Sequence, residues 1–310
     1  DRFLLLQSCR ANFSPVMGLF RYEGRGVRAL LGELPLDRPA LSAVDDSGVA
    51  YHVWVVSDEK TTARVSQFFA DKTVYIADGH HRYETALAYQ REQRSAHSSY
   101  KGDEGFNFVM MTLTDAEDAD LVMFPTHRLV RGLREERIAK LKEGLSTYFY
   151  SEELLPPLNT PSETVASWLD ILERRRERGT TIGLYGLHGQ QLCLLAPRDE
   201  ETLRGRMLLD WPSPVKDLDV SLLHWMILPS MLGINSAEKE ESCLEYTRDG
   251  VKATSAVDSG AYQLAFLLAP AAISNVLAVA DAGLRMPPKS TYFYPKTPTG
   301  LVINPLWDDE

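Results

Sequence analysis

Short apolar runs separated by polar turns fill the first 130 residues, a pattern typical of β-strands joined by turns and short helices. A polar break over 10–15 separates the first two strands, and Asp45–Gly48 predicts a turn before the third. The pattern predicts strands at 3–6, 15–22, 50–56, 74–77, 106–114 and 121–124, with helices at 61–69 and 83–94.

Helical spacing is more frequent in the second half of the chain. Thr160-Pro-Ser-Glu163 is a capping box with Pro at the first helical position, and it predicts the start of a helix. Two apolar runs around His188-Gly189 predict a β-hairpin. Further elements are expected as a helix near 138–145, a helix over 218–232 bent at Pro229, strands at 243–247 and 262–268, and a helix over 273–282.

Together these elements predict an α/β protein of the α+β kind, with mixed sheets. The length of 310 residues favours two packed units over one. We place the first unit at 1–130 and a second α+β unit at 131–310. Hydrophobic residues make up 44% of the chain and charged residues 25%, the balance of an ordinary globular protein.

Charge and cysteine usage narrow the functional classes. A formal net charge of −10 argues against a nucleic-acid partner but allows a local basic pocket for one phosphorylated small molecule. Cys9, Cys193 and Cys243 have no CxxC spacing, which fits a reducing, cytoplasmic setting. No apolar run is long enough to predict a membrane span. Because the chain begins at Asp1 without a Met, we expect residues to be missing before it.

The strongest candidate for chemistry is the strand–turn–helix segment Asp78-Gly-His-His-Arg82. Gly79 can take a positive φ, and the first-turn amides of the following helix form an anion site. His80, His81 and Arg82 add donors, and Arg82 can bind phosphate oxygens through two hydrogen bonds. Asp78 can cap the helix or accept a proton from a hydroxyl.

Two other interpretations of this segment stay open. Asp-Gly is a common turn, and a histidine there can simply satisfy a backbone group. A transition-metal site is the chemical alternative, with ligands drawn from Asp78, His80, His81, Glu84 and a distant residue such as His127. Successive helical side chains diverge by about 100°, so His80 and His81 cannot easily face one ion.

Two distant segments repeat the basic chemistry. Pro125-Thr-His-Arg128 follows a strand end and could add His127 and Arg128 to a pocket, or it could be a Pro-led helix entry. Lys289-Ser-Thr-Tyr292, with Lys296 close behind, could bind a phosphate or stack a base, or could be a terminal strand with exposed lysines. The polar loop at 10–15 is a weaker candidate, with Arg10, Asn12 and Ser14 as possible ligand contacts.

Three segments, in this order, resemble the microbial family called domain of unknown function 1015. They are Tyr75-Ile-Ala-Asp-Gly-His-His-Arg-Tyr-Glu-Thr-Ala-Leu87, Pro125-Thr-His-Arg128 and Met286-Pro-Pro-Lys-Ser-Thr-Tyr-Phe-Tyr-Pro-Lys296. The resemblance covers essentially the whole chain, although family members usually carry a further N-terminal stretch. The family name brings no assigned activity.

Asp78-Gly-His-His-Arg82 is also similar to the phosphate-binding segment of the superfamily of ParB-type nucleotidases, sulfiredoxin and free-serine kinases. This resemblance implies a ParB/sulfiredoxin-like first unit and a nucleotide-dependent phosphotransferase or nucleotide hydrolase. It would use ATP or ADP with Mg²⁺ and act on a small hydroxyl-bearing metabolite such as serine. A non-catalytic sensor of a nucleotide or phosphorylated metabolite is the alternative, followed by a metal-dependent hydrolase using Asp78, His81 and His127.

On the transferase hypothesis, the catalytic residues are Asp78, His80 and His81. The expected cofactor-binding residues are Gly79, His80, His81, Arg82, His127, Arg128, Lys289, Ser290 and Thr291. The sequence specifies neither a resident metal ligand set nor an oligomeric state.

Overall fold

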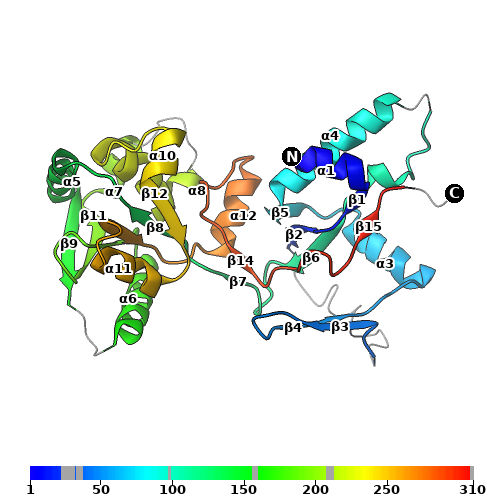
Figure 1. The fold of residues 1–310 in the computed structure, drawn as a ribbon, viewed down its shortest axis with the longest axis horizontal. Coiled ribbons are helices and arrows are strands. Elements are labelled where there is room, and N and C mark those ends of the chain that lie inside the picture. Colours follow the sequence, from blue (N-terminus) through cyan, green and yellow to red (C-terminus); the bar gives the residue numbers. More distant parts are fainter. Residues whose placement is uncertain (22–31, 33–37, 97–98, 156–159, 207–212, 308–310) are drawn as a thin grey trace. The chain divides into compact units, whose positions relative to one another are not determined.

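The structure is a computed structural model that describes residues 1–21, 32, 38–96, 99–155, 160–206 and 213–307 (Figure 1). Contacts between residues divide the chain into two compact units. The first comprises Asp1–Leu121 and Pro295–Glu310, and the second comprises Val122–Tyr294. The chain therefore leaves the first unit, builds the second, and returns, whereas the sequence pattern placed one boundary at 130.

The first unit mixes short strands with three longer helices among its described residues. Its elements are α1 (Arg2–Cys9), β1 (Ala11–Asn12), β2 (Val16–Phe20), β3 (Leu41–Val44), β4 (Ala50–Val53), α3 (Glu59–Phe69), β5 (Val74–Asp78), α4 (His80–Ala96), η1 (Gly105–Asn107), β6 (Met111–Asp115) and β15 (Asn304–Pro305). Part of the sequence-predicted strand at 15–22 lies outside the described residues.

A three-stranded sheet in the order β5-β2-β6 forms the centre of the first unit. The middle strand, β2, is buried along its whole length and runs antiparallel to β5 but parallel to β6. Its register against β5 shifts between Met17 and Gly18, so that Met17 pairs with Asp78. This irregularity lies beside the end of β5, where a bulge can redirect a side chain.

The predicted strand at 3–6 is wrong, because these residues belong to helix α1. Leu4 and Leu5 are exposed while Leu6 is buried, and the Arg10 amide closes the helix on the Leu6 carbonyl at 2.8 Å. An apolar run this short does not distinguish strand from helix by periodicity.

The predicted strand at 106–114 is shorter than expected. Its first residues form the single turn η1, and β6 begins only at Met111. Asn107 explains the difference, because its side-chain carbonyl accepts from Arg94 and Gln90 while its amide donates to Glu104. These polar contacts stabilise a turn at residues whose apolar pattern alone favours a strand.

The second unit is built from helices around one large sheet. Its elements are β7 (Val122–Met123), β8 (His127–Val130), α5 (Glu135–Tyr148), β9 (Phe149–Leu154), α6 (Pro161–Arg176), β10 (Ile182–Tyr185), β11 (Leu192–Pro197), α7 (Glu200–Arg206), α8 (Ser213–Lys216), α9 (Asp219–Leu222), η2 (Leu223–Met231), α10 (Ala237–Cys243), β12 (Leu244–Thr247), α11 (Gly250–Asp258), β13 (Leu264–Leu267), α12 (Ile273–Asp281) and β14 (Phe293–Tyr294).

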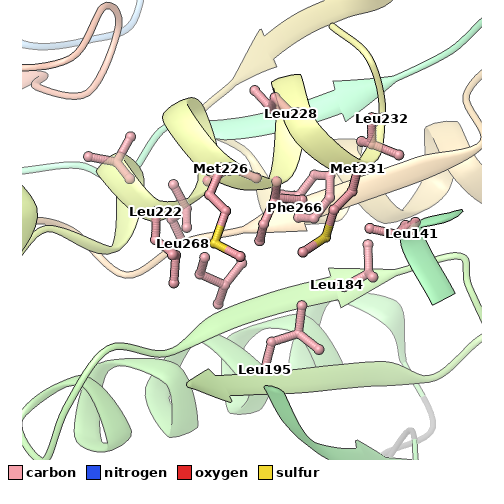
Figure 2. Close-up of a cluster of buried hydrophobic side chains, with 14 of the residues drawn as sticks. Leu141, Leu184, Leu195, Leu222, Met226, Leu228, Met231, Leu232, Phe266 and Leu268 are labelled. Atoms are coloured by element: carbon pink, nitrogen blue, oxygen red, sulfur yellow. The ribbon is translucent and has the colours of Figure 1, made fainter. Parts of the chain in front are cut away.

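The sheet has six strands in the order β12-β8-β13-β10-β11-β9, and every neighbouring pair is antiparallel. Its two faces are both buried. Leu184 and Leu195 pack with η2 and α5 on one face, and Figure 2 shows them opposite Met226 and Met231. Alternate strand residues pack with α6 and α11 on the other face. This double coverage explains why the strands are apolar at consecutive positions.

Several predicted features of this unit are confirmed. Thr160 caps α6 by accepting from the Glu163 amide, as the capping box predicted. The hairpin around His188-Gly189 is present as β10 and β11. The helix over 218–232 is present too. Its second part, η2, is a π-helix, and Pro229 lies within it instead of producing a simple bend.

The alternative of a helix entry at Pro125–Arg128 is wrong, since His127 and Arg128 open strand β8. The predicted mixed α/β fold class is confirmed by these elements and sheets. Among the helices of the described residues, none combines the length and apolarity needed to cross a membrane.

Candidate functional site

The junction between β5 and α4 turns on a glycine in the left-handed backbone region. Gly79 has a φ of 88°, which is strained for a residue with a Cβ. Space is short as well, because a Cβ at Gly79 would lie 2.8 Å from Nε of Arg82. The Tyr83 amide donates to the Gly79 carbonyl at 3.0 Å. Glycine therefore lets the strand pass directly into the helix while Arg82 folds back over the turn.

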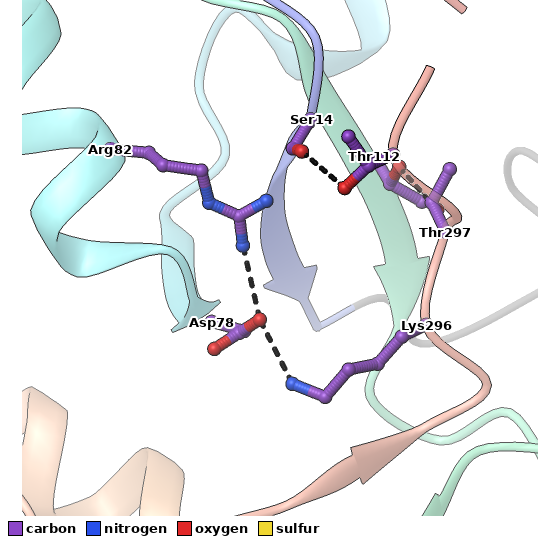
Figure 3. A network of polar contacts seen from close by, with 7 residues as sticks. Ser14, Asp78, Arg82, Thr112, Lys296 and Thr297 are labelled. Atoms are coloured by element: carbon purple, nitrogen blue, oxygen red, sulfur yellow. Dashed lines mark hydrogen bonds and ion pairs between the residues drawn. The ribbon is translucent and has the colours of Figure 1, made fainter. Parts of the chain in front are cut away.

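Asp78 ends β5 between two cationic side chains (Figure 3). Its Oδ2 accepts from Nη2 of Arg82 at 3.0 Å and from Nζ of Lys296 at 2.9 Å. Partial burial pushes the pKa of Asp78 upward, but the hydrogen bond and charge of Lys296, with the charge of Arg82, outweigh it and leave the pKa below its ordinary value. Asp78 is therefore a carboxylate at neutral pH, held from two sides.

A cavity of about 580 Å³ opens beside this junction, entirely within the first unit. Its volume lies in the range of small-molecule sites in proteins. Residues 78–82 form part of its lining, and α1 and the loop at 11–14 contribute Arg2, Asn12 and Ser14. Asp78 is the only carboxylate among the described residues that line this cavity. Its walls thus favour an anionic ligand.

Hydroxyl groups tie the returning end of the chain to this unit (Figure 3). Ser14 Oγ lies 2.7 Å from Thr299 Oγ1. Thr112 Oγ1 lies 2.8 Å from Thr297 Oγ1. A few residues further on, β15 pairs with β1. These contacts fix the segment that carries Lys296 and so hold its ammonium group against Asp78.

The two histidines of the junction have different surroundings. His81 is exposed, and its Nδ1 lies 3.3 Å from Oε2 of Glu84 one turn along α4. His80 begins α4 and lines the cavity. Across the described parts of the chain, no three His, Cys, Asp or Glu side chains are grouped so that they could hold a metal ion.

The other predicted site residues lie in the second unit. His127 is fully buried in β8, and its Nδ1 accepts from the Leu268 amide at 3.2 Å. Burial, together with the charge of Arg128, lowers the pKa of His127 to about 4. At neutral pH His127 is therefore an uncharged imidazole that holds the end of β13.

Arg128 joins β8 to the segment before β14. Its guanidinium donates to the carbonyls of Thr126, Pro288 and Lys289, the last two at 3.4 and 3.2 Å. Ser290 Oγ donates to the Pro287 carbonyl. The structure thus brings the predicted residues at 127–128 and 289–291 into one unit. That they share a pocket with residues 78–82 stays a prediction.

From the run at 286–296, the sequence led us to include Lys289 among the expected site residues, whereas Lys296 was noted only as its neighbour. Both lysines follow a proline and stand among the same aromatic residues, so the run itself gives no reason to prefer either. Arg2 was missed because residues 3–6 were interpreted as a strand. Asn12 and Ser14 were considered only as weak candidates, although both line the cavity.

Comparison with solved structures finds distant similarities. One is a conserved hypothetical protein from Pyrococcus furiosus, with 13% identity, a TM-score of 0.43, and coverage of 96% of this chain and 84% of that one. Another is a free serine kinase in complex with AMP, with 13% identity, a TM-score of 0.41, and coverage of 94% and 77%. A variant of free serine kinase in complex with ADP gives 13% identity and a TM-score of 0.42.

Among curated protein sequences, none matches this chain significantly. A family model does match: the one described as "Protein of unknown function (DUF1015)" covers residues 1–221. This match spans more than half of the chain and includes both the Asp78–Arg82 junction and the start of β8. The chain therefore belongs to the DUF1015 family, as the three sequence segments indicated.

Proposed function

We propose that the first unit binds the phosphates of ATP or ADP with Mg²⁺ and transfers a phosphoryl group to a hydroxyl of a small metabolite. The observation that carries this proposal is the start of α4 beside a cavity of about 580 Å³, with Arg82 folded over it. The first amides of a helix point outward with the positive end of its dipole, which favours phosphate. The similarity of Asp78–Arg82 to the free-serine-kinase segment supports the same placement.

Each residue of the junction has a role in this proposal. Arg82 contacts phosphate oxygens through its planar group of donors, and His80 and His81 add further hydrogen bonds. Asp78 positions the acceptor hydroxyl. Phosphoryl transfer asks for little covalent chemistry from a protein, so positioned cations and one orienting carboxylate suffice.

The described lining of the cavity offers one carboxylate to a magnesium ion. Mg²⁺ is usually held by one or two carboxylates, water and the substrate phosphates. Asp78 is the carboxylate that the lining of the cavity offers among its described residues. Mg²⁺ bound there would neutralise phosphate charge, and most of its ligands would come from the nucleotide and water.

A sensor of a nucleotide or phosphorylated metabolite is the second candidate function, and one observation favours it. Asp78 already accepts from Arg82 and Lys296 through a single oxygen, and its pKa is lowered. A carboxylate held in this way is a weak base. A sensor needs only the cationic pocket and no proton acceptor.

Binding is tested by isothermal titration of the full chain with MgADP and MgATP. Arg82→Ala should weaken binding by about tenfold or more, since a charge-assisted hydrogen-bond pair is lost. Arg91→Ala is the matched control, because Arg91 lies exposed on α4 and does not line the cavity. Equal affinity of the two variants, or no binding by the unaltered chain, would contradict the proposal.

Asp78→Asn separates the enzyme from the sensor. The substitution keeps an oxygen at position 78 and removes a negative charge beside Arg82 and Lys296, so nucleotide affinity should be largely kept. Turnover is measured as release of ADP from ATP, and of AMP from ADP, in the presence of a panel of hydroxyl-bearing metabolites. An enzyme loses this turnover in the variant, whereas a sensor shows none in either protein.

A further inference from the structure

The second unit contains a cavity of its own, with a volume of about 160 Å³. A cavity of about 150 Å³ is large enough to admit benzene, so this one has room for about six to eight non-hydrogen atoms. Its walls come from the start of β8, the end of α6, the region around α9, and α12. Two buried ionisable residues, Arg128 and Asp219, line it.

Arg128 brings a positive charge into this cavity without a matching carboxylate. Its side chain is 2% exposed, and its hydrogen bonds go to the main-chain carbonyls of Thr126, Pro288 and Lys289. Within the described residues, no acidic side chain forms an ion pair with it. Burial lowers the pKa of Arg128 to about 10, which leaves it protonated at neutral pH. A buried charge of this kind is costly until an anion faces it.

Asp219 brings an acidic group to the same cavity. It is 9% exposed, and its Oδ1 accepts from the Thr181 amide at 3.3 Å. Burial raises the pKa of Asp219 to about 7, although the charge of Arg176 opposes this. Asp219 therefore retains unused capacity to accept hydrogen bonds from a donor placed in the cavity.

The two groups do not neutralise each other. Arg128 and Asp219 form no ion pair in the described structure, and the shifts of their pKa values come from other neighbours. Asn275 and Ser290 also line the cavity and add uncharged polar groups. Arg176 and the exposed Asp217 line the cavity too. A pocket with a buried arginine that forms no ion pair, a separate acceptor and further polar groups is suited to a ligand with an acidic group and a donor on one small skeleton.

We propose that this cavity binds a small amino or hydroxy acid, with its carboxylate on Arg128 and its amino or hydroxyl group on Asp219. The proposal does not depend on nucleotide binding, because every residue that carries it belongs to the second unit. The amino and hydroxy acids share this chemistry, and the probes below distinguish them.

The probes are L-serine, L-lactate and acetate, titrated calorimetrically into the full chain. L-serine carries both an ammonium and a hydroxyl group, L-lactate carries a hydroxyl only, and acetate has no donor. Each of the first two fits the available volume. We expect acetate to bind at least about tenfold more weakly than the better of the other two, because it cannot reach Asp219 with a donor.

Asn275→Asp is the main variant, since it places a negative charge in the lining at the third residue of α12. An acidic residue in the first turn of a helix suits its dipole, so folding should tolerate the change. The charge should repel the probe carboxylate and weaken binding by about tenfold or more. Ser274→Asp is the matched control, because it adds the same charge to an exposed neighbour outside the lining.

Asp219→Asn provides a second variant of nearly unchanged shape. It should weaken L-serine binding more than L-lactate binding if the ammonium group faces position 219, and both similarly if a hydroxyl does. The proposal is overturned if neither L-serine nor L-lactate binds the unaltered chain. It is also overturned if Asn275→Asp and Ser274→Asp, both confirmed as folded by thermal melting, bind the probes equally.

Discussion

Each unit presents a cavity whose lining includes an arginine that directly follows a histidine, together with an aspartate, but these charges are arranged in opposite ways. In the first unit Arg82 and Asp78 contact each other at the open end of a strand, and their side chains are 30% and 42% exposed. In the second unit Arg128 and Asp219 are both buried and form no pair. A paired, half-exposed site can release its cation to a ligand, whereas the buried one holds its charges in fixed positions.

The arginines should differ most in their contribution to stability. Arg128→Leu leaves three main-chain carbonyls without their donor, and we expect the free energy of unfolding to fall by about 3 kcal/mol or more. Arg82→Leu removes one half-exposed ion pair and should cost less than about 1 kcal/mol. Urea denaturation measures both, and equal losses would remove the distinction between the two regions.

The aspartates should give opposite dependences of stability on pH. The pKa of Asp219 is raised to about 7 in the folded chain, so the unfolded chain releases this proton first as pH rises. Its contribution to stability therefore falls between about pH 4 and pH 7. Asp219→Asn should match the unaltered chain near pH 4 and exceed it by about 2–4 kcal/mol at pH 8.

Asp78 has a lowered pKa, so its contribution is present above about pH 4 and is lost as pH falls through the folded value. Asp78→Asn should therefore be slightly less stable than the unaltered chain at neutral pH. The loss should stay under about 1 kcal/mol because the pair is half exposed. Chemical denaturation at several pH values checks both variants, and parallel curves would contradict this contrast.

Two glycines at positive φ, one in each unit, test local rigidity. Gly79→Ala is strained at its positive φ, and it would also displace the flexible Arg82 guanidinium, so we expect a loss of about 1–2 kcal/mol in stability. Gly186→Ala, also at positive φ, would meet the backbone carbonyl oxygen of Gln263 at 2.6 Å, which cannot move aside. Gly186→Ala should therefore lose more stability than Gly79→Ala. Thermal melting ranks the two, and the reverse order would show that the first-unit turn is the more rigid.

The smallest effect is expected from Lys296→Ala. Loss of its hydrogen bond and charge should raise the pKa of Asp78, while stability changes by less than about 1 kcal/mol because the pair is half exposed. Titration of the Asp78 carboxyl by NMR measures the shift. An unchanged pKa would mean that Arg82 alone holds the carboxylate.

Local patterns predicted the strand, the glycine turn and the helix around Asp78–Arg82, because all of these depend on neighbouring residues. They also predicted the capping box at Thr160 and the hairpin at His188-Gly189. Lys296 could not be assigned to Asp78 in this way, because that contact depends on the chain returning after the whole second unit. The burial of Arg128 is equally non-local, since the neighbouring strands β12 and β13 and the segment before β14 surround it.

The helix at residues 2–9 was missed for a different reason. Its apolar residues fit a strand as well as a helix, and only its packing against α4 decides between them. Leu6 contributes to a small cluster with Tyr89 and Leu306, residues far away in the sequence. Arg2 then enters the cavity lining as a consequence of that packing, which a short window of sequence does not contain.

The return of the chain to its first unit also has a consequence for the order in which the protein matures. The second unit is one continuous stretch, Val122–Tyr294, and can fold as soon as the ribosome releases it. The first unit can complete its folding only later, because Lys296 and β15 belong to it but are synthesised after the whole second unit. A prematurely terminated product would hold Asp78 and Arg82 but not the third charge. The junction of such a product would therefore lack the contact of Lys296 with Asp78.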